Sequence, residues 1–74
     1  MKKVDSMVRI ICKNGDIIIG KYKGIDIDGV LLGKNTKINY EYNGNKREVL
    51  MKYGAHVYFS NIDMILNVKE EEKK

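Results

Sequence analysis

Residues 7–32 read MVRIICKNGDIIIGKYKGIDIDGVLL. Two predicted strands rich in β-branched residues, at residues 7–12 and 16–23, flank the dipeptide Asn14-Gly15. This dipeptide is the strongest short signal for a β-hairpin, because both of its residues tolerate a positive φ. Gly20 lies inside the second of them, and a glycine inside a strand marks a bulge or a sharp bend, as at the corner of a small barrel. The stretch therefore predicts a bent β-hairpin.

The rest of the chain continues this pattern of short strands separated by turns. The further strands are predicted at residues 29–33, 37–42, 47–53, 57–59 and 62–66. Short strands with regularly spaced turns are typical of a small barrel. Residues 1–6 leave room for at most one helical turn before the first strand. The expected fold class is therefore all-β.

The length of 74 residues allows one domain. A chain of this size buries only about 60% of the surface that it exposes when unfolded, so its core is thin and support from oligomerisation is expected. In residues 69–74 lysines and glutamates cancel in charge. We therefore expect one domain over residues 1–68 and a charged, disordered tail over residues 69–74.

The net charge of +4 favours a polyanionic partner such as nucleic acid. No apolar run approaches the roughly 18 residues of a membrane span. The start of the chain lacks the apolar stretch of a secretory signal, and Cys12 is the only cysteine. These features predict a cytoplasmic protein in a reducing compartment without membrane association.

Few residues have the chemistry of an active site or a metal site. His56 is the only histidine, so a second imidazole for a metal site or a proton relay is missing. Cys12 lies in an apolar run, where an inert buried thiol is the ordinary interpretation. The segment Asp26-Ile27-Asp28-Gly29 begins like a calcium loop but lacks the remaining ligands. We expect no enzymatic activity, no catalytic residue, no metal and no cofactor.

Residues 8–32 resemble the first signature of the Sm/Lsm family, the ring-forming RNA-associated proteins that include the bacterial host-factor type. The matching positions, at the family's intervals, are Asn14-Gly15, Gly20, Gly24-Ile25-Asp26 and Val30-Leu31-Leu32. Gly54 and residues 57–65 resemble the second signature. The resemblance covers about residues 7–67. The length of the segment 34–53 is closer to the archaeal and eukaryotic Sm-like proteins than to the host-factor type.

The resemblance implies a strongly bent, five-stranded antiparallel sheet that closes into a small open barrel. In the family, the fourth strand of one subunit pairs with the fifth strand of the next, which builds a ring of six or seven subunits. The corresponding interface segments here are 49–51, 57–59 and 62–66. Such a homo-oligomeric ring would carry a charge of about +24 to +28 and would attract a polyanion.

The resemblance also implies a site for single-stranded, U-rich RNA on two loops that face the central pore. The residues at these positions are Asp26, Asp28, Val30, Phe59, Ser60 and Asn61. Asp26 is expected to brace its loop. Asp28 stands at the usual stacking position, and Val30 replaces an asparagine that is common in the family. Phe59-Ser60 stands in place of Arg-Gly or Lys-His.

Two of these residues have alternative interpretations. Phe59 either packs in the barrel core or stacks on a base, and Asn61 either completes a turn or reads a base edge. Two alternative functions also remain open. One is a ring scaffold with a degenerate nucleotide pocket, and the other is a monomeric SH3-like barrel that binds a protein partner.

Overall fold

A computed structural model describes residues 3–68, and this part of the chain is almost entirely β-structure, as predicted. Its elements are β1 (Met7–Cys12), β2 (Ile17–Ile25), β3 (Gly29–Leu32), β4 (Thr36–Tyr42), β5 (Asn45–Met51), β6 (Ala55–Tyr58), the 3₁₀ helix η1 (Phe59–Asn61) and β7 (Ile62–Asn67). Residues 3–6 form a turn and no helix before β1. The tail predicted at residues 69–74 lies outside the described residues.

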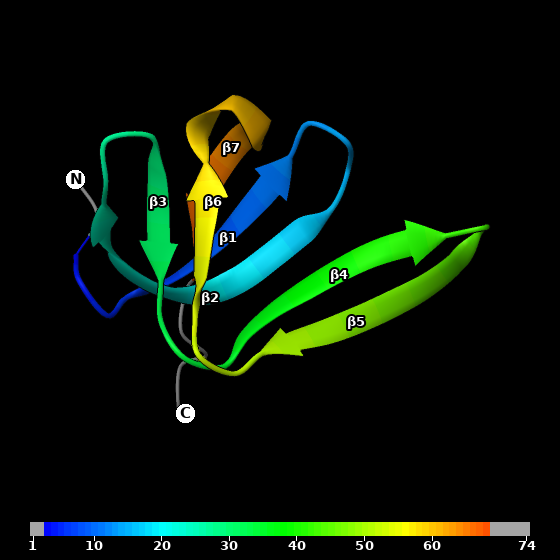
Figure 1. The fold of residues 1–74 in the computed structure, drawn as a ribbon, viewed down its shortest axis with the longest axis horizontal. Helices are drawn as coiled ribbons and strands as arrows, with labels where there is room; N and C mark the ends of the chain where they lie inside the picture. Colours follow the sequence, from blue (N-terminus) through cyan, green and yellow to red (C-terminus); the bar gives the residue numbers. More distant parts are fainter. Residues whose placement is uncertain (1–2, 69–74) are drawn as a thin grey trace.

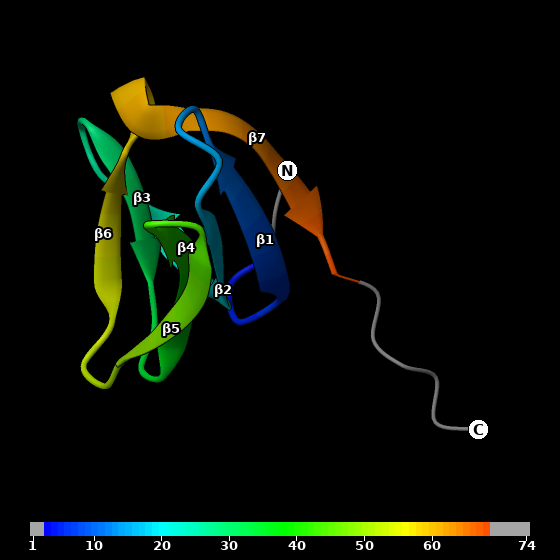
Figure 2. The same ribbon diagram turned by 90° about the vertical axis from the view of Figure 1, so that its right-hand side faces the viewer.

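The strands form one antiparallel sheet that folds around a common core (Figures 1 and 2). The order along the main path is β5-β4-β2-β1-β7, and β3 pairs with β2 on one side and with β6 on the other. The β4–β5 hairpin projects away from the rest of the sheet (Figure 1). The family resemblance implies five strands, and the structure has seven because two of the five are each divided at a bend. One is divided into β3 and β4, and the other into β5 and β6.

The long strand β2 pairs with two neighbours in succession on one of its sides. Its first residues pair with β4, and its last residues pair with β3. The register of the second pairing shifts between Tyr22 and Gly24. The bulge therefore lies a few residues beyond Gly20, while the change of partner strand falls at Gly20, between Ile19 and Tyr22. Gly20 also leaves room for the buried Thr36, whose Oγ1 a Cβ at this position would overlap.

The two predicted Asn-Gly and Asn-Gly-Asn turns both connect antiparallel strands, with different backbone conformations. Asn43 and Gly44 have φ values of 51° and 79°, the two positive values of a type I′ turn. In the first hairpin only Gly15 has a positive φ, and its N–H donates to the Cys12 carbonyl at 2.9 Å. The Asn14 side chain accepts a hydrogen bond from the Asp16 N–H at 3.0 Å and so closes this turn.

The hydrophobic core is small. Its buried apolar residues are Val8, Ile10, Cys12, Ile18, Val30, Leu32 and Val57. They lie on alternating positions of β1, β2, β3 and β6, because successive side chains of a strand point to opposite faces. Within residues 3–68 no helix has the length and apolar character needed to cross a membrane.

Candidate functional site

Two loops meet at one end of the sheet. Residues 26–28 connect β2 to β3, and η1 connects β6 to β7. The Phe59 N–H donates to the Asp28 carbonyl at 2.9 Å and joins the loops directly. Inside the first loop, the Asp26 N–H donates to the Gly29 carbonyl at 2.8 Å, and the Ile27 N–H donates to Asp26 Oδ1 at 2.8 Å. The expected bracing role of Asp26 fits this last hydrogen bond.

The second loop presents its three predicted residues at the surface. Phe59, Ser60 and Asn61 form η1, and all three are exposed. Phe59 begins this helix instead of ending the strand, and 44% of its surface is exposed, so it is not a core aromatic. The Asn61 carbonyl accepts a hydrogen bond from the Lys13 N–H at 2.8 Å, which ties η1 to the first hairpin.

Val30 lies in the core. It pairs with Val57 across β3 and β6 and is only 1% exposed. A buried apolar side chain cannot contact a ligand at the surface, so Val30 does not belong to the candidate interface. Strand alternation accounts for this position, because β3 turns Val30 and Leu32 toward the interior.

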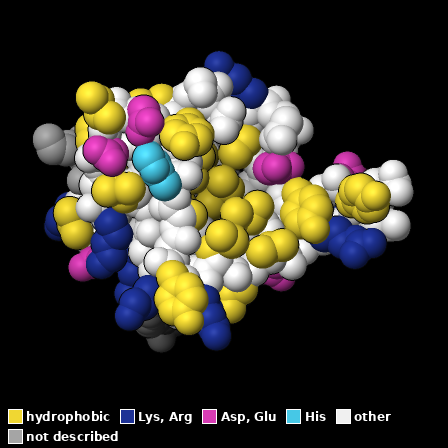
Figure 3. Space-filling view, viewed as in Figure 1, with side chains coloured by type: hydrophobic (Ala, Val, Ile, Leu, Met, Phe, Trp, Pro, Cys, Tyr) yellow, Lys and Arg dark blue, Asp and Glu magenta, His cyan; other side chains and the backbone are white. Residues whose placement is uncertain are grey.

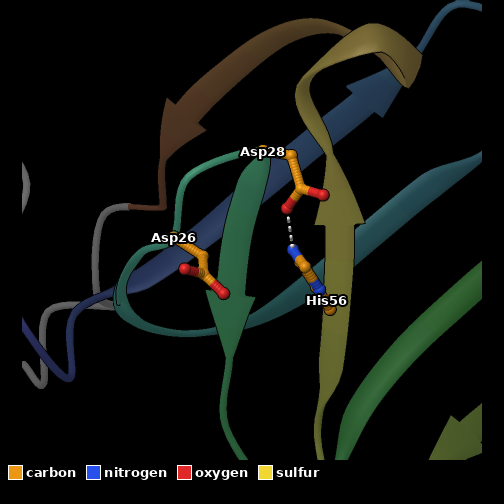
Figure 4. Close-up of side chains that lie close together, drawn as sticks. All are labelled: Asp26, Asp28 and His56. Carbon is orange, nitrogen blue, oxygen red and sulfur yellow. Dashed lines mark ion pairs between the residues drawn. The ribbon is translucent and has the colours of Figure 1, made fainter.

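His56 joins the site although the sequence analysis gave it no role. It lies on β6, and its Nε2 is 3.1 Å from Asp28 Oδ1 (Figure 4). Its ring lies where a side chain at Gly29 would be, since a Cβ there would be 2.7 Å from Nε2 and 2.4 Å from the Val57 carbonyl. The pairing of β3 with β6 creates this proximity across 28 positions of sequence, and no local motif signals it.

The charge close to the two loops is negative. Asp26 and Asp28 are both exposed here, whereas the Lys and Arg side chains visible on this face lie mostly along its margins (Figure 3). Lys23, near the loop end of β2, forms an ion pair with Asp5 at 2.5 Å, and this partner lowers the pKa of the Asp5 carboxyl. The loops themselves therefore carry no part of the chain's net charge of +4.

An open groove of about 490 Å³ runs beside η1 and β6. Its lining combines apolar side chains, among them Ile18, Ile38 and Met51, with polar groups of η1 and the first hairpin. Apolar side chains are visible in the middle of this face in Figure 3. Within residues 3–68, β6 pairs with β3 but with neither β5 nor β7, the two ends of the main path, so the sheet does not close on itself.

Cys12 lines the same groove and is 8% exposed. Burial raises the pKa of the Cys12 thiol, and the Asp16 carboxylate raises it further. Because the thiolate is the reactive form, we expect the native thiol to react with dithionitrobenzoate at pH 8 about tenfold more slowly than in the urea-unfolded chain. Equal rates in the native and unfolded chains would show that the thiol is not protected as described.

These observations define a small, open, all-β protein with a two-loop site. The chain matches no protein-family model and no curated protein.

Proposed function

We propose that the chain is an archaeal-type Sm-like protein of the cytoplasm that forms a homo-oligomeric ring and binds single-stranded, U-rich RNA. The RNA site is the joint surface of residues 26–28 and η1. The proposal rests on the resemblance of the sequence signatures, and the structure supplies an arrangement with which it is compatible.

The observation that carries the RNA site is the contact of the two loops with Phe59 and Asn61 exposed on one of them. Sequence-specific proteins for single-stranded RNA stack bases on aromatic rings and bond to base edges with polar side chains. Phe59 supplies an exposed ring and Asn61 an exposed amide, which is both donor and acceptor. In this proposal Phe59 therefore stacks on a base, and Asn61 forms hydrogen bonds to a base edge.

Ring assembly is supported by the unpaired edges of the sheet. In residues 3–68, β7 is one end of the strand order, while β5 and β6 each have a single partner. Apolar side chains are exposed on both sides, including Leu50 and Tyr58 on one side and Met64 and Leu66 on the other. Unpaired edge strands promote association, and a repeated head-to-tail contact that closes gives a ring. A neighbouring copy would also cover the groove beside β6.

We expect the substitution Asn61→Ala to weaken binding of a U-rich oligoribonucleotide by about tenfold, the effect of losing roughly one net hydrogen bond per bound base. Fluorescence anisotropy with labelled U-rich and A-rich oligoribonucleotides at two salt concentrations measures this effect. Asn45→Ala is the matched control, because it removes an exposed amide at the start of β5, away from the two loops.

Other results would support the alternatives. Equal affinity for U-rich and A-rich RNA that is lost at the higher salt concentration would show that only the attraction between lysine and phosphate holds the RNA. The absence of binding at either salt concentration would favour a ring scaffold, which the carboxylates of Asp26 and Asp28 also favour because they repel phosphate. A solution mass near 8.5 kDa would leave only the monomeric SH3-like barrel.

A further inference from the structure

Three side chains able to bind metal converge beside the end of β6. They are Asp26 and Asp28 of the loop before β3 and His56 of β6 (Figure 4). One ligand atom from each lies within 4.8 Å of the other two, and all three residues are exposed. The cluster therefore combines one imidazole nitrogen with oxygens from two carboxylates.

The backbone around the cluster positions these side chains. The loop is closed by the hydrogen bond from the Asp26 N–H to the Gly29 carbonyl and is attached to η1 through the Asp28 carbonyl. Gly29 leaves space for the imidazole, since any side chain there would collide with His56 and with the Val57 carbonyl. The Tyr58 ring, on the strand position opposite Gly29, also lies next to His56, with the two ring centroids 5.1 Å apart.

We propose that Asp26, Asp28 and His56 bind one divalent transition-metal cation of the Zn²⁺ class. Zn²⁺ holds imidazole nitrogens and carboxylate oxygens at about 2.0–2.2 Å, so its ligand atoms lie roughly 3.5 Å apart. Asp28 Oδ1 and His56 Nε2, 3.1 Å apart, lie within about half an ångström of this spacing. Asp26 needs to approach by at most about 1.3 Å, which an exposed side chain achieves by rotation. Solvent completes the coordination.

The chemistry of the donors favours this class of cation over Mg²⁺ or Ca²⁺. Imidazole is a ligand of zinc, copper and nickel, whereas the hard cations take oxygen ligands. Two carboxylates also balance the charge of one divalent ion, so binding removes the repulsion between Asp26 and Asp28. No metal was expected from the sequence, because His56 and the Asp26–Asp28 segment were considered separately and only the β3–β6 pairing brings them together.

Isothermal titration calorimetry with ZnCl₂ on the untagged full chain tests the proposal, with MgCl₂ as the comparison salt. We expect one Zn²⁺ per chain, and affinity for Mg²⁺ at least about tenfold lower. His56→Gln and Asp28→Asn should each weaken Zn²⁺ binding by about tenfold or more. Asp63→Asn is the matched control, because it removes an exposed carboxylate on β7 outside the cluster.

A second measurement reports the ligand directly. His56 is the only histidine, so its imidazole proton resonances are assigned without ambiguity, and we expect Zn²⁺ to shift them at one equivalent. Cys12→Ala should leave this shift unchanged. Zn²⁺ binding that survives His56→Gln at full strength, or an imidazole that does not respond, would overturn the proposal. Neither measurement uses RNA, so the result is independent of the proposed RNA-binding function.

Discussion

The variant Gly54→Ala is expected to unfold with a free energy about 3 kcal/mol lower than that of the unsubstituted chain. Gly54 has a φ of +107°, a backbone conformation that costs an L-residue roughly 1–2 kcal/mol. A Cβ at this position would also lie 2.7 Å from the Leu32 carbonyl oxygen. Because this neighbour is backbone, it cannot rotate away, and overpacking of this kind costs about 1–3 kcal/mol.

Gly44→Ala is the matched control for this experiment. Gly44 also has a positive φ, +79°, but a Cβ there would have no atom within 4 Å. We expect a loss of only about 1 kcal/mol, due to the backbone conformation alone. Urea unfolding followed by far-UV circular dichroism measures both variants, at one protein concentration because assembly would shift the midpoint. Equal losses in the two variants would contradict the close approach of residues 52–54 to β3.

The double variant Met64→Lys/Leu66→Lys is expected to reduce the solution mass from that of a ring to about the 8.5 kDa of one chain. Both residues lie on the terminal strand β7 and are exposed, 46% and 41% respectively. Two ammonium groups on this edge strand oppose pairing with another copy, which is how natural sheets protect free edges. Light scattering coupled to size-exclusion chromatography measures the mass.

Ile27→Lys is the control for assembly. Ile27 is 91% exposed in the loop between β2 and β3, outside the proposed interface segments 49–51, 57–59 and 62–66 and not on β7. We therefore expect it to add the same kind of charge without changing the mass. A double variant that keeps the mass of a ring would exclude β7 from the interface, and an unsubstituted chain that is already monomeric would contradict ring assembly itself.

The strands were predictable because their signals are local. The run before Asn14-Gly15 predicted β1 with the bounds that the structure has, and the alternation of residues 37–42 predicted β4 to within one residue. Phe59 was placed in a strand because it follows Val57 and Tyr58, but it starts η1. The exposure of Phe59 could not be derived from its apolar side chain, because apolar character indicates only that burial would be favourable and not that the residue is buried.

The candidate site was predictable only in part. The resemblance placed functional residues on two loops, and the structure shows these loops in contact through Phe59 and Asp28. Val30 is buried because one face of β3 packs on the core and Val30 lies on that face. Which face this is depends on how the sheet folds, and the sequence signature does not specify it. His56 was assigned no function because it is the only histidine, and its partner Asp28 lies 28 positions away in the sequence.

By itself the sequence determined the class of fold, since turn residues and β-branched runs act over a few positions and need no distant contact. Tertiary structure decided which side chains meet. His56 reaches Asp28 because β6 pairs antiparallel to β3, and the groove stays open because, within residues 3–68, β6 has no second partner strand. Both depend on pairing between strands far apart in the chain, where one shift in register moves every side chain to the opposite face.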